Sequence, residues 1–279
     1  MTGTPDFLTR IIEQKRLRLV HAQSLRTLAE VRDEALRVRS ESRPHALRAA
    51  LEGERDFNVI AEIKRASPSL GDIRRDASPA ELALRYEAGG AAAISVLTEE
   101  DHFKGSPEDL REVRAATSLP LLRKDFIFEE WQLYEAAAAR ADALLLIVAA
   151  LDDATLIRLR RIAEDELGMD ALVEVHTHEE LRRAAVCGAT IIGVNNRNLH
   201  NFEVSLATSV ELIEHAPAGA LLVSESGLRT HADLRRLKSL GYRGFLIGET
   251  LMRAGDPTGA LRALLTEEKV EERARSVDE

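Results

Sequence analysis

The stretch 57-FNVIAEIKRASPSLG-71 places two opposite charges in a segment that otherwise has the pattern of a buried strand. Side chains alternate between the two faces of a strand, so Glu62 and Lys64 share the face that Ile60 also occupies. An unpaired charge on a buried face is costly, which predicts that the two residues pair with each other or with a ligand. An edge strand with a solvated charged face is the alternative. The loop that follows carries hydroxyls and a glycine, so its backbone amides can approach an anion.

From Phe57 onward the sequence repeats one unit, which consists of a short apolar run, a loop and an amphipathic helix. Eight such runs lie near Val59, Ala92, Leu121, Leu144, Leu172, Ile191, Leu221 and Phe245. Eight units at a spacing of roughly 20 to 35 residues predict an α/β fold, a (β/α)8 TIM barrel. A doubly wound open sheet is the alternative, but no Gly-x-Gly-x-x-Gly motif follows the first run.

The helices of these units carry residues that satisfy terminal backbone groups. Ser78 with Glu81, and Thr177 with Glu180, have the spacing of a capping box. Glycines follow several helices and are predicted to terminate them, namely Gly89, Gly168, Gly188 and Gly241.

We expect residues 1–279 to form a single domain with three parts. These are an N-terminal helical extension over residues 1–55, the barrel over 56–266 and a charged C-terminal tail over 267–279. Leu8, Ile11 and Leu19 form an apolar stripe in the extension, which predicts that it covers the mouth or flank of the barrel. The charged residues 30–43 are expected to be mostly solvated surface.

Composition narrows the classes of function. Asp and Glu number 47 against 38 Lys and Arg, and the resulting net charge of -9 argues against a nucleic-acid partner. No run approaches the roughly 18 apolar residues of a membrane span, and the first residues lack a signal-peptide pattern. The single cysteine, Cys187, cannot form an internal disulfide, which favours a cytoplasmic location.

A barrel of this kind places its catalytic residues at the C-terminal ends of the strands. The charged and polar residues at these ends are Glu62, Lys64, Lys124, Glu174, Asn195, Glu225 and Ser226. Side-chain parity places them in a common cavity, where a structural ion-pair network is the alternative to a catalytic site. Glu174 is expected to stand alone at the end of the fifth strand, whereas Glu62 has Lys64 beside it.

The last two units favour a phosphate site, because such barrels hold phosphate after strands seven and eight at the start of a short extra helix. The candidate residues are Ser226, Gly227, Gly248 and Glu249, with Lys64 and Ser67 from the first loop. A glycine at a strand end is otherwise only a turn. His176 and His178 form an H-x-H pair without a third ligand at suitable spacing, so no metal and no cofactor is expected.

The segments VIAEIKRASPS, LRKDF, LVEVH, IIGVNNRNL, VSESG and IGETLM occur in this order. This series resembles the signature segments of the indole-3-glycerol-phosphate synthase family of tryptophan biosynthesis, from about residue 5 to about residue 265. The resemblance implies closure of 1-(2-carboxyphenylamino)-1-deoxyribulose 5-phosphate to indole-3-glycerol phosphate, with loss of carbon dioxide and water. It also implies a small phosphorylated substrate. No cofactor and no obligate partner is expected, and the chain is expected to act as a monomer. Leu70 stands where the family often has lysine, and Trp131 where smaller residues are common.

By this resemblance, Lys124 is the general acid for ring closure and Glu174 the acid or base for dehydration. Lys64 contacts the substrate carboxylate and phosphate, with Glu62 as its partner. The residues that orient the sugar hydroxyls and the reacting arm are Asn195, Arg197, Glu225 and Ser226. Phe103 and Phe126 flank the aryl ring, although core packing explains a lone phenylalanine nearly as well. A Schiff-base aldolase that uses Lys64 or Lys124, and a noncatalytic phosphosugar-binding barrel, are the alternatives.

Overall fold

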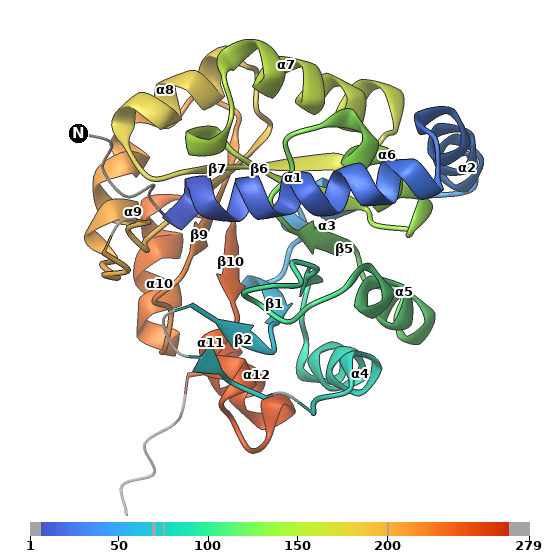
Figure 1. The fold of residues 1–279 in the computed structure, drawn as a ribbon. Coiled ribbons are helices and arrows are strands. Elements are labelled where there is room, and N and C mark those ends of the chain that lie inside the picture. Colours follow the sequence, from blue (N-terminus) through green and yellow to red (C-terminus); the bar gives the residue numbers. More distant parts are fainter. Residues whose placement is uncertain (1–6, 69–70, 75, 200, 268–279) are drawn as a thin grey trace, which may run out of the picture.

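Eight parallel strands close into a barrel, which confirms the predicted fold class (Figure 1). The computed structural model describes residues 7–68, 71–74, 76–199 and 201–267. Around the barrel the order is β1 (Asn58–Ile63), β10 (Gly244–Ile247), β9 (Leu221–Glu225), β8 (Ile191–Asn195), β7 (Asp170–Val175), β6 (Ala143–Ile147), β5 (Leu121–Lys124) and β4 (Ala93–Leu97). The predicted roles of Leu70 and of the tail beyond Glu267 lie outside the described residues.

Helices alternate with the strands and cover the outside of the barrel. They are α4 (Pro79–Gly89), α5 (Pro107–Ala116), α6 (Glu130–Ala138), α7 (Asp153–Arg161), α8 (His178–Val186), α9 (Ala207–Leu212), α10 (His231–Leu240) and α12 (Pro257–Leu265). Shorter segments are the hairpin β2 (Ala66–Ser67) and β3 (Gly71–Asp72), the turns η1 (Val148–Ala150), η2 (Ile162–Glu166) and η3 (Ile213–His215), and α11 (Glu249–Met252).

Both predicted capping boxes form only in part. Ser78 accepts from the Glu81 N–H, and Thr177 accepts from the Glu180 N–H. The Glu180 carboxylate accepts from the N–H of His176 rather than from that of Thr177. The reciprocal half of the Thr177 box is therefore replaced by a bond to the residue that precedes the cap.

The predicted helix stop at Gly89 is wrong by one residue. Gly89 is the last residue of α4, and Gly90, with φ of 97°, is the C-cap. Gly89 serves packing instead, because a Cβ there would lie 3.0 Å from Cδ2 of Leu261 on α12. Gly241 caps α10 with φ of 119°, as predicted.

Strand parity separates an inner core from an outer core. Val59 and Ala61 of β1 point outward and join the cluster beneath the helices. Ile60 points inward and packs with Leu122 and Leu172 in the barrel interior. Because of this alternation, the residue two positions after an inner apolar residue also faces inward. At the C-terminal ends of the strands these inward-facing residues are polar.

The first helix, α1 (Phe7–Leu25), runs across the mouth of the barrel, and Figure 1 shows it in front of the strands. Lys15 is buried there and donates to Asp125 after β5 and to Glu100 after β4, both at 2.9 Å. Burial lowers the pKa of Lys15, but Asp125 and Glu100 raise it above its usual value. The lysine therefore ties α1 to the strand ends as a charged group.

The second helix, α2 (Leu28–Ser40), packs on the flank of the barrel; most of residues 30–43 are exposed, as expected, but one face of the helix is buried. Val31 and Ala35 are fully buried in the outer core. Arg39 is also buried and donates to the carbonyl groups of Leu167 and Gly168 at 2.8 and 2.9 Å. A charged segment can thus carry a narrow apolar stripe and one arginine whose donors are satisfied by backbone oxygens.

The third helix, α3 (Ala46–Leu51), closes the bottom of the barrel. Leu47 and Leu51 are fully buried and belong to the interior cluster with Ile60. The Asn58 amide donates to the Leu51 carbonyl at 2.8 Å and to the Arg243 carbonyl at 3.1 Å. The extension therefore contacts the barrel at its mouth, on its flank and at its base.

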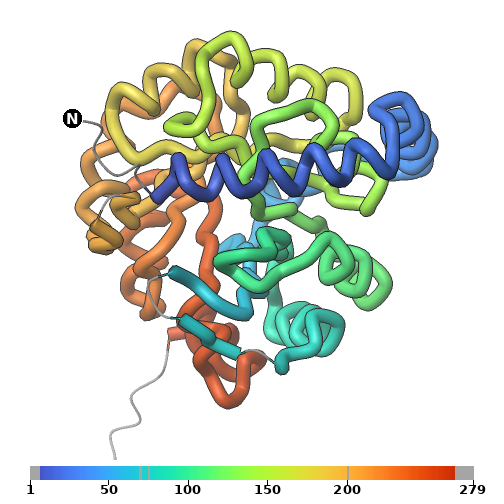
Figure 2. Tube along the Cα trace, viewed as in Figure 1, coloured from blue at the N-terminus to red at the C-terminus, as the bar shows by residue number. Residues whose placement is uncertain are grey.

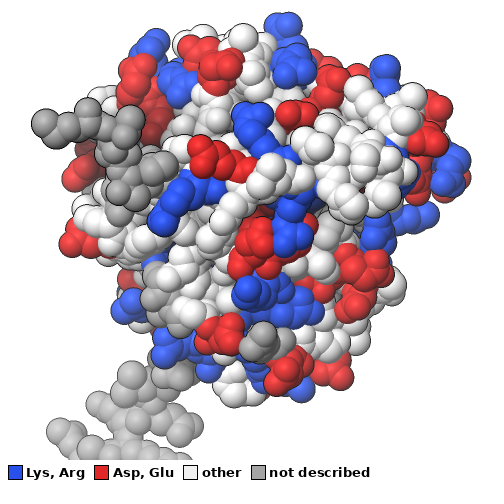
Figure 3. Space-filling model, in the orientation of Figure 1, with Lys and Arg blue, Asp and Glu red and all other residues white. Residues whose placement is uncertain are grey.

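The barrel closes where the first and last strands pair. Asn58 through Ala61 of β1 lie opposite Gly244 through Ile247 of β10 in parallel register. Outside this seam α12 packs on α4, and Figure 2 shows the red and teal segments lying together. In the part of the chain that the structure describes, no helix is long and apolar enough to span a membrane. The face in Figure 3 carries both basic and acidic side chains, scattered among uncharged ones.

Candidate active site

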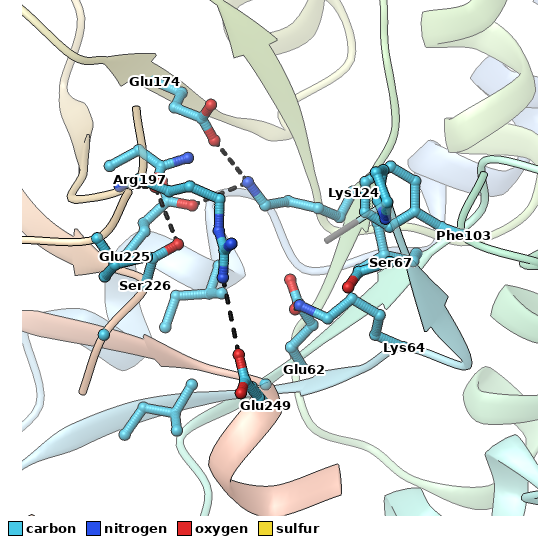
Figure 4. Close-up of a pocket in the computed structure, with 18 of the residues that line it drawn as sticks. Glu62, Lys64, Ser67, Phe103, Lys124, Glu174, Arg197, Glu225, Ser226 and Glu249 are labelled. Carbon is cyan, nitrogen blue, oxygen red and sulfur yellow. Dashed lines mark hydrogen bonds and ion pairs between the residues drawn. The ribbon is translucent and has the colours of Figure 1, made fainter. Parts of the chain in front are cut away.

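A cavity of about 560 Å³ opens at the C-terminal ends of the strands beneath α1. All of the predicted site residues line it: Glu62, Lys64, Ser67, Phe103, Lys124, Phe126, Glu174, Asn195, Arg197, Glu225, Ser226, Gly227, Gly248 and Glu249. Figure 4 shows the charged groups of these residues converging from several strands. Side-chain parity accounts for the residues on the strands themselves, which are Glu62, Lys124, Glu174, Asn195 and Glu225, and the loops that follow the strands bring in the others.

Lys124 occupies the centre of the charged group. Its ammonium donates to Glu174 Oε2 at 2.6 Å and to Glu225 Oε2 at 2.8 Å. All three side chains are buried. The expectation that Glu174 stands alone is therefore wrong, because β5, β7 and β9 bring one lysine between two glutamates (Figure 4).

Burial and neighbouring charges shift the pKa values of these three groups in different directions. Burial alone would lower the pKa of Lys124, but Glu174, Glu225 and Glu62 together raise it well above its usual value. Burial raises the pKa of Glu225 to about 7, against the attraction of Lys124. Glu174 is also buried, but Lys124 and His176 hold its pKa well below the usual range. At neutral pH the site thus contains an ammonium, a firmly ionised carboxylate and a carboxyl group that can take up a proton.

Glu62 and Lys64 form the second pair, as predicted from their spacing. The Lys64 ammonium donates to Glu62 Oε1 at 2.6 Å. Gly248 makes room for this carboxylate, since a Cβ at position 248 would overlap Glu62 Oε1. Gly193 does the same for Glu225 Oε1. Two glycines on β8 and after β10 are therefore required by the glutamates that face them.

Asn195 and the loop after β9 form the polar wall of the cavity. Ser226 Oγ donates to Asn195 Oδ1 at 2.9 Å. Ser226 and Gly227 both have left-handed backbone, with φ of 66° and 81°. Asn196, buried beside them, donates to the Glu225 and Ser226 carbonyl groups at 3.0 and 3.1 Å. The sequence motif contained Asn196, but only the fold shows that it holds this turn.

The candidate phosphate end lies between this turn and α11. Gly248 is the N-cap of α11, and Glu249 is its first residue, as expected. The Arg197 guanidinium lies 3.7 Å from Glu249 Oε2 and reaches this end from the loop after β8. Cationic and amide donors can therefore surround a dianion here, which matches the anion-binding design of such barrels.

Phe103 and Phe126 face each other across the apolar side of the cavity, with ring centroids 6.2 Å apart and planes tilted by 39°. The buried carboxylate of Glu99 fixes the Phe103 loop, because it accepts from the His102 and Phe103 N–H groups at 2.7 and 2.9 Å. A carboxylate that accepts hydrogen bonds from consecutive backbone amides produces no periodic pattern in the sequence, so the role of Glu99 could not be predicted from it.

The N-terminal helix and the loop after β8 add apolar lining that was also missed. Phe7, Leu8 and Phe202 line the cavity, and the rings of Phe7 and Phe202 meet edge to face at 5.2 Å. Leu8 belonged to a predicted apolar stripe, but the stripe did not identify its partner. Among the described residues, no group of three or more His, Cys, Asp or Glu side chains could hold a metal ion.

Comparison with known proteins identifies the family. A model of the family described as indole-3-glycerol phosphate synthase matches residues 8–264. The chain belongs to the indole-3-glycerol phosphate synthase family. A synthase of this name from Aromatoleum aromaticum is 46% identical over 259 residues, which cover 93% of this chain and 98% of that protein. The corresponding proteins of Azospirillum brasilense and Carboxydothermus hydrogenoformans are each 47% identical, over 93% of this chain and 99% of those proteins.

This relationship confirms the predicted activity. The chain has indole-3-glycerol phosphate synthase activity, a carboxy-lyase reaction of tryptophan biosynthesis, and acts on a phosphorylated, sugar-derived substrate.

Solved structures are similar to the chain in fold alone. Thiamine phosphate pyrophosphorylase from Pyrococcus furiosus is 18% identical, with a TM-score of 0.56 over 75% of this chain and 93% of that chain. KGPDC from Streptococcus mutans, in complex with D-R5P, is 17% identical, with a TM-score of 0.55 over 75% of this chain and 95% of that chain.

Proposed function

We propose that Lys124 is the general acid that drives closure of the indole ring. The observation that carries this proposal is the position of its ammonium between Glu174 and Glu225 inside the cavity. As the ring carbon that bears the carboxylate attacks the ketone carbon, Lys124 donates its proton to the ketone oxygen. Carbon dioxide then leaves, and the electron pair of the broken bond restores the aromatic ring.

Glu174 acts in the dehydration that follows. Loss of water requires removal of a carbon-bound proton and departure of the new hydroxyl group with a proton. An ionised carboxylate at hydrogen-bond distance from the spent Lys124 amine suits the first of these steps. Glu225, whose pKa is raised to about 7 by burial, suits the return of a proton to Lys124.

The remaining residues bind and orient the substrate. Lys64, held by Glu62, contacts the substrate carboxylate and phosphate, and Ser67 closes the same side. The groups that bind the phosphate and the sugar arm are Asn195, Arg197, Ser226, Gly227, Gly248 and Glu249, the last two through backbone amides at the start of α11. Phe103 and Phe126, whose ring centroids lie 6.2 Å apart, move apart to enclose the aryl ring.

A Schiff-base mechanism is disfavoured at Lys124. A lysine that attacks a carbonyl must be neutral, whereas the surrounding glutamates raise the pKa of Lys124 despite its burial. The assay that tests the proposal is incubation with the carboxyphenylamino deoxyribulose phosphate, with indole fluorescence as the readout and borohydride trapping in parallel. We expect fluorescence without a trapped adduct; an adduct on Lys124 or Lys64 would contradict acid catalysis.

We further propose that the chain acts as a cytoplasmic monomer and folds as one domain. The parts are the extension over residues 1–55, the barrel over 56–266 and the tail over 267–279. Support for one domain comes from Leu47 and Leu51, which belong to the extension but lie in the barrel interior. The cavity contains every residue assigned a role in the reaction, so the proposed chemistry needs no residue of a second copy. Analytical ultracentrifugation at working concentration tests the oligomeric state.

Deletion of residues 1–40 is expected to raise KM by at least about tenfold and to lower the thermal midpoint, because Leu8 lines the cavity and Val31 is buried on the flank. The variant keeps α3, so the barrel base stays closed and circular dichroism should remain that of an α/β protein. Leu17→Ala is the control, since Leu17 is 74% exposed on the outer side of α1. If the truncated and full chains had the same KM and the same thermal midpoint, residues 1–40 would contribute neither to substrate binding nor to stability.

Gly248→Val is expected to raise KM and also to lower kcat. The valine side chain blocks the approach of a phosphate to the backbone at α11, and it displaces the Glu62 carboxylate that holds Lys64. Gly255→Val is the matched control, because a Cβ at that position meets no atom within 4 Å. Steady-state kinetics on both variants provide the measurement. If a folded Gly248→Val had the kinetic constants of the wild type, the phosphate site could not lie at the start of α11.

A further inference from the structure

His176 contacts the site without lining the cavity. It directly follows β7, and its imidazole is one-tenth exposed. Nε2 of the ring lies 3.4 Å from Glu174 Oε1, and Nδ1 lies 3.0 Å from Glu180 Oε2. The backbone N–H of His176 donates to the same oxygen of Glu180 at 2.7 Å. The ring is thus held between a carboxylate of the site and a carboxylate on α8.

Both ring nitrogens of His176 face carboxylate oxygens. A neutral imidazole has one donor nitrogen and one lone pair, so one of the two contacts would be repulsive. An imidazolium makes both contacts attractive: Nδ1 donates to Glu180, and Nε2, which has no hydrogen-bond partner among the described residues, forms an ion pair with Glu174 at 3.4 Å. Burial lowers the pKa of His176, but Glu174 and Glu180 raise it to about 10, in agreement with the geometry. The adjacent segments β6, η1 and β8 contain no titratable side chain, so Glu174 and Glu180 are the charged groups that face the ring.

The second cation makes the two carboxylates around Lys124 unequal. Glu174 contacts both Lys124 and His176, whereas Glu225 contacts Lys124 alone among the described cationic side chains. Glu225 Oε1 is buried and accepts no hydrogen bond from the described residues. Two carboxylates that share one ammonium divide their roles when their surroundings differ.

We propose that His176, as an imidazolium, is a positioning residue that keeps Glu174 ionised and aimed at Lys124, so that Glu174 is the base and Glu225 carries the exchangeable proton. This inference rests on the proposed function of Lys124 and Glu174. It names the physical cause of their division of labour. His176 itself does not line the cavity.

Nitrogen NMR of the protein labelled with ¹⁵N-histidine tests the charge of the ring directly, with His176→Gln used to assign the signal. We expect both ring nitrogens of His176 to stay protonated from about pH 6 to about pH 8.5, whereas an ordinary histidine titrates near 6.5. In Glu174→Gln the midpoint should move downward. A His176 ring that becomes neutral below about pH 7 in the wild type would overturn the proposal.

Kinetics test the consequence for Glu174. His176→Gln should lower kcat by about tenfold with KM within about twofold of the parent, and the acidic limb of the kcat profile should move upward by about one pH unit. The direction follows because Glu174 loses a cation that favours its ionised form. Glu180→Gln, outside the cavity, should move the same limb by less.

His178→Gln is the matched control, because His178 is exposed two residues along and its ring meets that of His215 edge to face at 4.6 Å. Equal kinetic effects of His176→Gln and His178→Gln would sink the proposal. If His176→Gln does not fold, the histidine signal whose midpoint moves in Glu174→Gln assigns the ring, and the NMR titration of the wild type decides. That titration does not depend on turnover, so a failure of the Lys124 assignment would appear separately, as an active Lys124→Ala.

Discussion

Lys124→Ala is expected to lower turnover by about two to four orders of magnitude while leaving substrate binding within a few-fold of the parent, as for loss of a general acid. The fold should survive, although the change leaves two buried carboxylates without their shared ammonium. Glu225 relieves that repulsion by taking up a proton, since burial already raises its pKa to about 7. Single-turnover fluorescence and equilibrium binding of the substrate provide the two measurements.

Lys104→Ala is the control for Lys124→Ala. Lys104 lies at the mouth on the loop after β4, and its ammonium donates to the Asp101 carbonyl at 2.9 Å rather than into the cavity. We expect parent-like kinetics from it. A folded Lys124→Ala with a rate within about threefold of the parent would remove Lys124 from the acid role, because that role accounts for at least about a hundredfold.

Glu174→Gln is expected to stall the reaction after ring closure, with a loss of roughly a hundredfold in overall rate. Glutamine keeps the shape and one acceptor of the side chain but cannot take a proton from the substrate. Binding should change little, because Glu225 still holds Lys124 at 2.8 Å. Rapid quenching of single turnovers should therefore reveal a closed, decarboxylated intermediate that accumulates before the indole product.

Glu62→Gln provides the contrast with Glu174→Gln. It removes the counter-charge 2.6 Å from the Lys64 ammonium, so both binding and turnover should fall without a late intermediate. The change is close to isosteric and keeps the space next to Gly248. If the two glutamine variants showed the same kinetic pattern, the assignment of separate roles to the two glutamates would be wrong.

Most of the fold, and most of the residues of the site, could be predicted from short-range patterns in the sequence. Apolar runs of strand length separated by amphipathic helices identify the barrel, and the alternation at Ile60, Glu62 and Lys64 indicates which side chains point inward. The same alternation brought Lys124 and Glu174 to the cavity. These features depend on residues close in sequence, where period and parity are strong signals.

Features that depend on distant partners could not be predicted in the same way. Nothing near Glu174 in the sequence shows that Lys124 reaches it from a strand two positions away around the barrel. The role of Leu47 and Leu51 was equally hidden, because an apolar helix face indicates burial but not the surface that covers it. The role of Glu99 was hidden as well, because its partners are backbone amides, and the sequence does not show which amides a carboxylate binds.

The base of the barrel constrains the order in which the chain can fold during synthesis. Leu51 and the Asn58 amide are made early, but the Arg243 carbonyl to which Asn58 also donates lies directly before β10, the last strand. The apolar face of α3 therefore has no complete site until the ribosome has released nearly the whole barrel. Nascent chains paused before β10 should expose this face to chaperones, and slow translation of the last quarter should increase misfolding more than slow translation of the first.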